Sequence, residues 1–225
     1  MISVTWIVLF SILVVSILGI IFTAIIFTKP VDEQKVSFMR IFPFEVIRTA
    51  EKEGKYYSLF TYLFAGMCFS PLISIVSEES KLRALNPLTI VIVCVLGLAA
   101  LCFIFLNIFD VTHTKPHLIL FTVFTFLVLL SGALLFARAL VGYNTCLDHG
   151  EKEYIFLVTE ILSGLSFAFV LCIVLNPKLK TWPRLDLVDG EYVRPKRFPL
   201  AYSEWGILLA LFFNEIVLFI ELLVK

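Results

Sequence analysis

Charge is scarce in this chain, and neither sign is in excess. Only 16% of the 225 residues are charged, and 18 basic residues balance 18 acidic ones, so the formal net charge is zero. A protein without a net positive field lacks the electrostatic attraction on which most nucleic-acid binding depends. We therefore expect no nucleic-acid partner.

The sequence also lacks the short motifs that mark common enzyme classes. It contains no Gly-rich phosphate loop, no H-E-x-x-H zinc signature and no recognisable Ser/His/Asp arrangement, and it has only three histidines. Nothing in the sequence points to an enzyme. We expect no catalytic residues and no cofactor.

Cysteine is limited to five residues, and their distribution does not suggest a disulfide framework. Cys68, Cys94, Cys102 and Cys172 lie in apolar runs, and only Cys146 lies in a predicted loop. A single loop cysteine cannot form an intramolecular disulfide between loops, so we expect all five to be free. The four in apolar runs are interpreted as small packing residues.

Long apolar runs dominate the chain instead. The sequence is 60% hydrophobic with a mean hydropathy of +0.99, whereas soluble domains contain about 45–50% apolar residues. A spanning helix needs about 20 apolar residues, and in lipid only helices or closed barrels satisfy their backbone groups. We therefore predict an all-α integral membrane protein, a single domain over 1–225 with six transmembrane helices. The predicted spans are about 4–28, 57–77, 87–109, 117–142, 154–176 and 205–224.

The first run is predicted to be an uncleaved anchor rather than a signal peptide. It lacks a basic n-region, exceeds the usual length of an apolar signal core, and shows no A-x-A-like cleavage site before Lys29. The run is therefore counted as the first span.

Basic residues in the loops predict the orientation. Loops 29–56, 110–116 and 177–204 together carry 13 Lys and Arg, whereas the opposite side carries four, with Arg138 left out as intramembrane. The positive-inside rule places the loops rich in basic residues in the cytoplasm. Both termini are then outside, and the expected location is the plasma membrane.

Two of the predicted cytoplasmic loops show signs of structure. In the loop 29–56, Pro43 suits the first turn of a helix and Gly54 suits its end, which predicts a short amphipathic helix on the membrane surface or an elbow into the second span. In the loop 177–204, an Asp-Gly turn signal separates the runs LDLV and EYV, which predicts a small hairpin. Either loop is a candidate docking site for a protein partner.

Polar residues within the apolar runs are the candidate site. A charge at mid-membrane costs about 2.5–3.5 kcal/mol on insertion scales, so such residues are usually functional or paired. The candidates for an intramembrane polar network are Arg138, Glu160, Asn214, Glu215 and Glu221. In the predicted orientation all of them lie in the middle or outer half of the membrane.

Two interpretations of Arg138 remain open. Arg138 and Glu221 lie near the ends of their spans, so each can extend its charged end to the membrane surface. Alternatively, Arg138 pairs with Glu160 or Glu215 inside the bundle. One arginine cannot neutralise two carboxylates, so the remaining acid is expected to keep its proton near neutral pH. A proton-coupled or cation-binding step requires such a carboxyl.

A metal site has little support in the sequence. Asp110, His113 and His117 have helical spacing and suitable ligand types, but Pro116 is expected to interrupt a helix there. A second cluster, Cys146, Asp148 and His149, is predicted on the opposite side of the membrane. We therefore expect no metal.

Two functions from different classes fit these patterns. The first is a small transporter or ligand-binding membrane protein with a polar intramembrane pocket toward the outer side. The second is a non-enzymatic membrane interaction subunit that docks a partner through its cytoplasmic loops. The state of the purified protein distinguishes them, because a stable monomer or homodimer favours the first and a stoichiometric heterocomplex favours the second.

Overall fold

Four long helices dominate the described part of the chain. A computed structural model describes residues 87–108, 114–149, 154–177, 186–188, 191–193 and 197–224, with the isolated positions 11, 14, 18, 42, 69, 72 and 73. The helices are α4 (Pro87–Ile108), α5 (Thr114–His149), α6 (Tyr154–Val174) and α7 (Pro199–Val224).

Each of these helices contains a stretch long and apolar enough to cross a membrane. These four helices are compatible with the helical membrane protein that the composition predicted. The predicted spans 4–28 and 57–77 and the predicted amphipathic helix of loop 29–56 lie almost entirely outside the described residues. The count of six helices accordingly stays a prediction.

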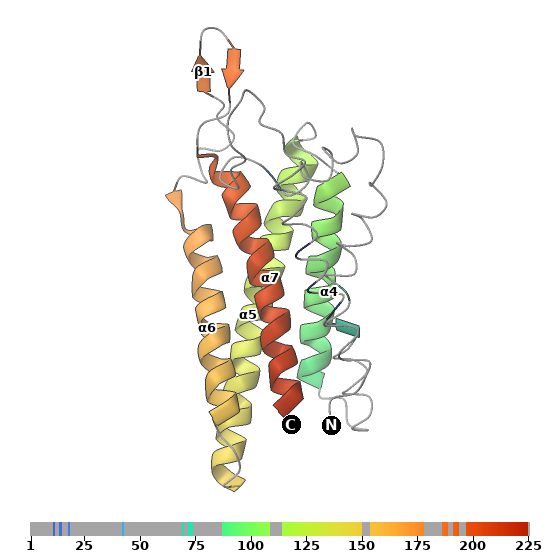
Figure 1. Ribbon diagram of the computed structural model, residues 1–225, viewed down its shortest axis with the longest axis vertical. Helices are drawn as coiled ribbons and strands as arrows, with labels where there is room; N and C mark the ends of the chain where they lie inside the picture. The colour runs from blue at the N-terminus through green and yellow to red at the C-terminus, as the bar shows by residue number, and fades with distance from the viewer. Residues whose placement is uncertain are drawn as a thin grey trace.

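The helices run alternately up and down beside one another (Figure 1). Helix α5 packs along both α4 and α6, and α7 contacts α4, α5 and α6. The spanning part of α7 is 72% buried, against 22–39% for the other three helices, although α7 is the least apolar of the four. Because protein rather than lipid surrounds most of α7, this helix can carry polar side chains that a lipid-facing helix cannot.

Helix ends differ from the predicted spans where proline or polar residues occur. Helix α7 begins at Pro199 rather than at 205, so Glu204 lies within the helix and not in the preceding loop. Helix α5 begins at Thr114, so Pro116 occupies its first turn, where a missing N–H costs nothing. The expectation that Pro116 interrupts the helix was therefore wrong. Helix α5 also continues to His149, which places Cys146 in a helix rather than a loop.

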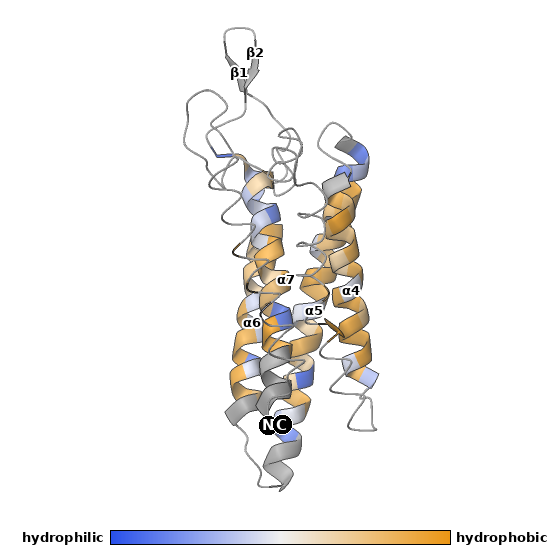
Figure 2. Ribbon diagram, turned by 45° about the vertical axis from the view of Figure 1, so that its right-hand side comes forward, coloured by the Kyte–Doolittle hydropathy of each residue, from blue (hydrophilic) through white to orange (hydrophobic). Residues whose placement is uncertain are grey.

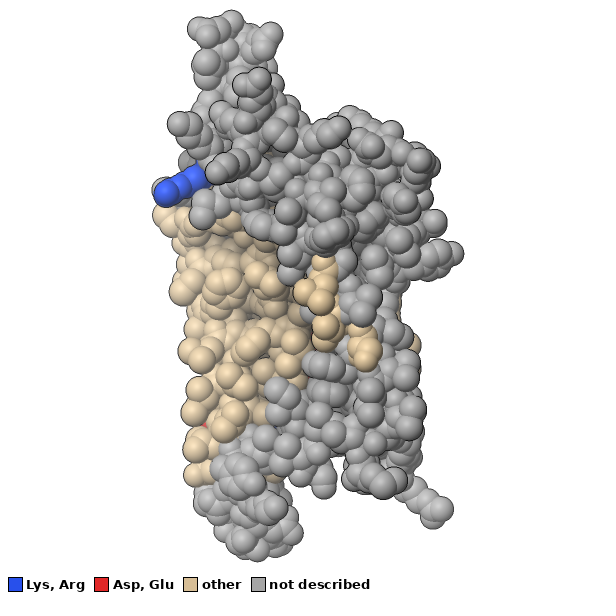
Figure 3. Space-filling model, viewed as in Figure 1, with Lys and Arg blue, Asp and Glu red and all other residues tan. Residues whose placement is uncertain are grey.

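The outward faces of the helices are apolar. Figure 2 shows hydrophobic colours along the helices, and on the face that Figure 3 shows, the Lys and Arg colour appears only at the upper edge of the described residues. Large apolar side chains are exposed on these faces, among them Leu98, Phe126 and Leu165. In water such a surface would cause aggregation, whereas in a bilayer it contacts lipid.

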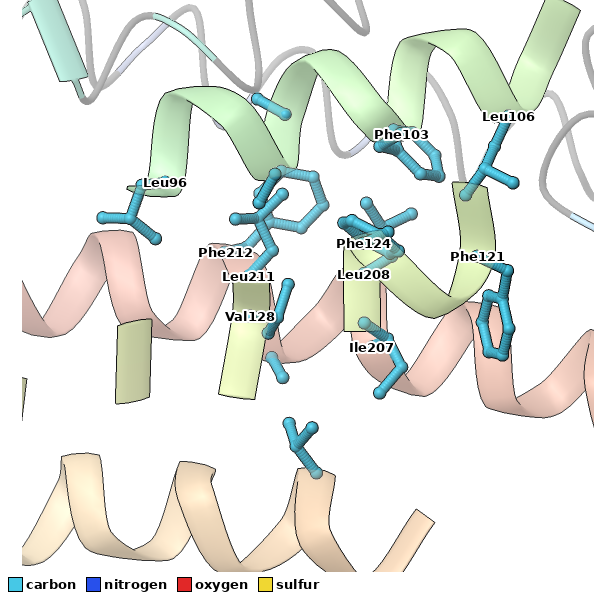
Figure 4. Close-up of a cluster of buried hydrophobic side chains, with 14 of the residues drawn as sticks. Leu96, Phe103, Leu106, Phe121, Phe124, Val128, Ile207, Leu208, Leu211 and Phe212 are labelled. Atoms are coloured by element: carbon cyan, nitrogen blue, oxygen red, sulfur yellow. The ribbon is translucent and has the colours of Figure 1, made fainter. Parts of the chain in front are cut away.

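The apolar core lies between α4, α5 and α7. Figure 4 shows side chains from the three helices converging on one cluster. In this cluster Phe103 of α4 and Phe124 of α5 lie with ring centroids 5.7 Å apart. The labelled members are Leu96, Phe103, Leu106, Phe121, Phe124, Val128, Ile207, Leu208, Leu211 and Phe212.

A β-hairpin extends beyond one end of the bundle (Figure 1). Strand β1 (Asp186–Val188) pairs antiparallel with β2 (Glu191–Val193), and Leu187 lies opposite Tyr192. The sequence between the strands is Asp-Gly, the dipeptide that favours a two-residue hairpin turn. The hairpin predicted from this signal is confirmed.

Candidate functional site

Helix α7 carries two polar pairs of neighbouring residues. We call Ser203 and Glu204 the N-terminal dyad, and Asn214 and Glu215 the C-terminal dyad; all four side chains are buried. Equivalent members of the dyads are eleven residues apart in the sequence. At 3.6 residues per turn this spacing is about three turns, so Glu204 and Glu215 lie on the same face of α7, about 16 Å apart.

In the N-terminal dyad, the carboxylate of Glu204 has a partner on α5. His117 Nε2 and Glu204 Oε1 are 2.7 Å apart, and both side chains are almost fully buried. The ring of Phe42 lies edge-on to the His117 ring at a centroid distance of 6.1 Å and also packs against Phe198. A proton between the imidazole and the carboxylate makes this contact a strong hydrogen bond, whichever group carries it.

In the C-terminal dyad, the amide of Asn214 is oriented by α5. The Ser131 hydroxyl donates to the carbonyl oxygen of Val128 at 2.8 Å. Asn214 Nδ2 donates to this hydroxyl at 2.8 Å. Nδ2 also donates to the Val128 carbonyl at 3.4 Å. The orientation leaves Asn214 Oδ1 buried and, among the described residues, without a hydrogen-bond partner.

The carboxyl group of Glu215 is the least compensated polar group in the described bundle. The side chain is 0% exposed, and neither carboxylate oxygen has a hydrogen-bond partner among the described residues. Along α7 its neighbours Leu211, Phe212 and Leu218 belong to the apolar core. An ionised carboxylate is costly in such surroundings unless a positive charge accompanies it. Glu215 is therefore expected to hold either a proton or a cation.

Arg138 lies inside the protein rather than at its lipid-facing surface. Its side chain is 4% exposed, and its Nη1 donates to Thr89 Oγ1 in the first turn of α4. Among the described residues, the structure forms no ion pair between Arg138 and either Glu160 or Glu215. One contact of Arg138 is thus with a hydroxyl on α4, which the sequence analysis did not consider.

The other predicted members of the network lie apart from the C-terminal dyad in the sequence. Glu160 is half-buried on α6, next to the buried Thr159 and Ser163. Glu221 belongs to the last turn of α7, and its side chain lies outside the described residues. That all five residues form one network stays a prediction.

The metal candidates are only partly described. His117 is bonded to Glu204, while Asp110 and His113 lie outside the described residues. Within the described ranges, no group of three or more His, Cys, Asp or Glu side chains is placed to hold a metal ion. The nearest approach to a ligand set is the His117–Glu204 pair, which has two members.

Sequence reasoning missed Glu204, Ser131 and Thr89. Glu204 was assigned to a loop because the polar residues before Trp205 lower the local hydropathy. The signal that was present is the spacing of Ser203-Glu204 and Asn214-Glu215 by three helical turns, which predicts one helix with both acids on the same face.

Comparison of the chain with protein-family models, with curated proteins and with solved structures finds no match.

Proposed function

We propose that the protein is a small transporter or ligand-binding membrane protein that binds a positively charged species, a proton or a cation, at Glu215. One observation carries the proposal. The Glu215 side chain is fully buried, and neither of its carboxyl oxygens has a hydrogen-bond partner among the described residues. An ionisable residue in this position within a membrane marks an ion or substrate site more often than a structural one.

The N-terminal dyad supports the proposal by contrast. On the same face of the same helix, the buried carboxyl of Glu204 is bonded to His117 at 2.7 Å. The bundle thus provides a partner for one buried acid and none, among the described residues, for the other. A purely structural role explains Glu204 but leaves the cost of Glu215 without compensation.

The proposed location is the plasma membrane, with both termini on the outer side. The first residue of α4, Pro87, and the first residue of α6, Tyr154, then also lie toward the outer side. In this orientation Glu215 lies past the middle of α7, in the outer half of the membrane, because α7 runs outward from Pro199. The ligand would then approach from outside, with Arg138 and Glu160 on neighbouring helices. The excess of basic residues in the predicted cytoplasmic loops supports this orientation.

Charge movement on a supported membrane tests the proposal without knowledge of an organic substrate. The protein is reconstituted into liposomes, and rapid jumps in pH, Na⁺ or K⁺ are applied. We expect at least one of these jumps to give a transient current in the parent protein. Glu215→Gln should lose the current, whereas the matched variant Glu204→Gln should keep it. Absence of a current from the parent in all three jumps would contradict the proposal.

The alternative function, docking of a protein partner, is favoured by the hairpin. Strands β1 and β2 extend beyond the helix ends, where a soluble partner can reach them (Figure 1). A membrane subunit of this kind would purify in a stoichiometric heterocomplex that a cut within the hairpin disrupts. A stable monomer or homodimer that shows the current described above excludes docking as the main function.

A further inference from the structure

We propose that the C-terminal dyad binds one alkali-metal cation, Na⁺ or K⁺, through Asn214 Oδ1 and the Glu215 carboxylate. The inference rests on the proposed function, because it names the ligand of the same site. Three buried oxygen atoms on these two adjacent residues lack a hydrogen-bond partner among the described residues. Buried polar atoms are nearly always satisfied in folded proteins, so three on neighbouring residues indicate a missing ligand.

The dyad offers buried oxygen acceptors. The Asn214 amide is anchored on α5 through Nδ2, which donates to Ser131 Oγ at 2.8 Å and to the Val128 carbonyl at 3.4 Å. An ionised Glu215 has no hydrogen to donate. Carbonyl and carboxylate oxygens are the ligands that hard cations prefer, and water can complete the coordination.

The charge of the site selects a monovalent ion. One carboxylate neutralises one positive charge, whereas a divalent ion would leave a second charge uncompensated in apolar surroundings. A proton on Glu215 would also neutralise the site. However, a single proton gives only one O–H, which can be donated to Asn214 Oδ1 but leaves the second Glu215 oxygen without a partner. A metal cation contacts several oxygens at once.

Thermal unfolding of the purified protein in detergent measures the predicted binding. Choline chloride is replaced stepwise by NaCl or KCl at constant ionic strength and constant pH. We expect the Tm to rise with one of the alkali ions, by about 3–6 °C at ten times the Kd, and to continue rising with the logarithm of the ion concentration above that. Choline chloride alone sets the baseline.

Three variants assign the effect to the dyad. Glu215→Gln should abolish the alkali-dependent rise in Tm, and Asn214→Ala should raise the apparent Kd about tenfold or more. Glu204→Gln is the matched control, since it changes the other buried acid of α7, and it should keep the rise. If Glu215→Gln does not fold, Glu215→Asp retains the charge but shortens the side chain, and it should change the ratio of the Na⁺ and K⁺ Kd values at least fivefold.

The outcomes distinguish this inference from the proposed function. A rise in Tm that persists in Glu215→Gln, or a Kd ratio unchanged in Glu215→Asp, places the cation elsewhere and overturns the inference. If Tm does not respond to Na⁺ or K⁺ and the currents follow pH jumps alone, the ligand is a proton. That result overturns the cation inference and leaves the proposed function standing. Absence of a current in every jump contradicts the proposed function itself.

Discussion

Two glutamates on one face of α7 illustrate how much the surroundings of a residue determine its role. Glu204 and Glu215 are both buried, but Glu204 is bonded to His117 and Glu215 has no hydrogen-bond partner among the described residues. Removing one member of a buried hydrogen-bonded pair leaves the other unsatisfied, which costs about 1–3 kcal/mol. Removing the charge from an unpartnered carboxyl carries no such penalty.

The two amide variants should therefore differ in stability. We expect Glu204→Gln to lower the free energy of unfolding by about 1–3 kcal/mol. The amide can still form a hydrogen bond with His117, but this bond is no longer strengthened by an ionised group. Glu215→Gln should leave stability within about 0.5 kcal/mol of the parent, or raise it, in buffer free of alkali ions. Thermal unfolding in choline chloride measures both. Equal losses in the two variants would show that Glu215 has a structural partner.

Arg138 offers a second test at the scale of single residues. Because its guanidinium is buried and donates to the Thr89 hydroxyl, Thr89→Val should leave a buried N–H without this acceptor and lower stability by about 1–3 kcal/mol. Arg138→Gln should also be less stable than the parent. Thermal unfolding of the two single variants and of the double variant measures the loss of stability in each.

The double variant provides the control for this pair. If the contact stabilises the bundle, the losses of Thr89→Val and Arg138→Gln should sum to more than the loss of the double variant. Stability of Arg138→Gln equal to that of the parent would instead mean that the arginine reaches the membrane surface at no cost.

At the scale of elements, glycines determine how closely the helices approach. Gly132 of α5 lies against the backbone of Phe167 on α6, and an added Cβ would be 3.5 Å from it. Gly142, further along α5, lies under the Phe156 ring of α6, which would collide with a Cβ at that position. Small residues at such contacts permit close packing in lipid, where the hydrophobic effect does not drive helices together.

Alanine at two glycines should therefore have different effects on stability. Gly142→Ala forces the Phe156 ring to move and should destabilise the protein by about 1–3 kcal/mol. Gly97→Ala is the matched control on α4, because its Cβ would meet only Leu72 Cδ1 at an ordinary 3.8 Å. It should be neutral or stabilise by up to about 1 kcal/mol through the higher helix propensity of alanine. Thermal unfolding in the same detergent compares the two variants. A loss of stability in both would mean that neither site has room for an added methyl group.

At the scale of the whole molecule, the alternating helices restrict where each loop can lie. The hairpin and the start of α7 at Pro199 lie at the same end of the bundle, while the end of α5 at His149 lies at the other (Figure 1). The orientation of the bundle in the membrane is predicted only from the distribution of basic residues. An experiment that probes both ends of the bundle is sufficient to determine this orientation.

Labelling with a membrane-impermeant maleimide tests the orientation in intact cells. Cys146, in the last turns of α5, should be labelled from outside. In a Cys146→Ser background, single cysteines at Glu191 in the hairpin and at Arg48 in the predicted loop 29–56 should be labelled only after the membrane is permeabilised. The reverse pattern would invert the orientation, and labelling of all three from one side would contradict the predicted number of spans.

The sequence by itself determined the features that depend on local composition. Apolar length and backbone satisfaction in lipid are properties of a single segment, so the four described helices were predicted with errors only at their ends. The β1–β2 hairpin was likewise predictable from its Asp-Gly turn. Burying Arg138 and Glu215 is costly wherever they pack, so their importance was evident from their position in apolar runs.

The partners of these residues were decided only by the tertiary structure. Thr89 and Arg138 are far apart in the sequence, as are His117 and Glu204 and also Ser131 and Asn214. Each pair depends on which helices are neighbours and how each is rotated about its axis, and six apolar runs permit many such arrangements. Lipid contributes nothing to this choice, because it solvates every apolar face equally. The contacts between helices therefore determine that Glu204 has a partner in His117 and that the Glu215 carboxyl has none among the described residues.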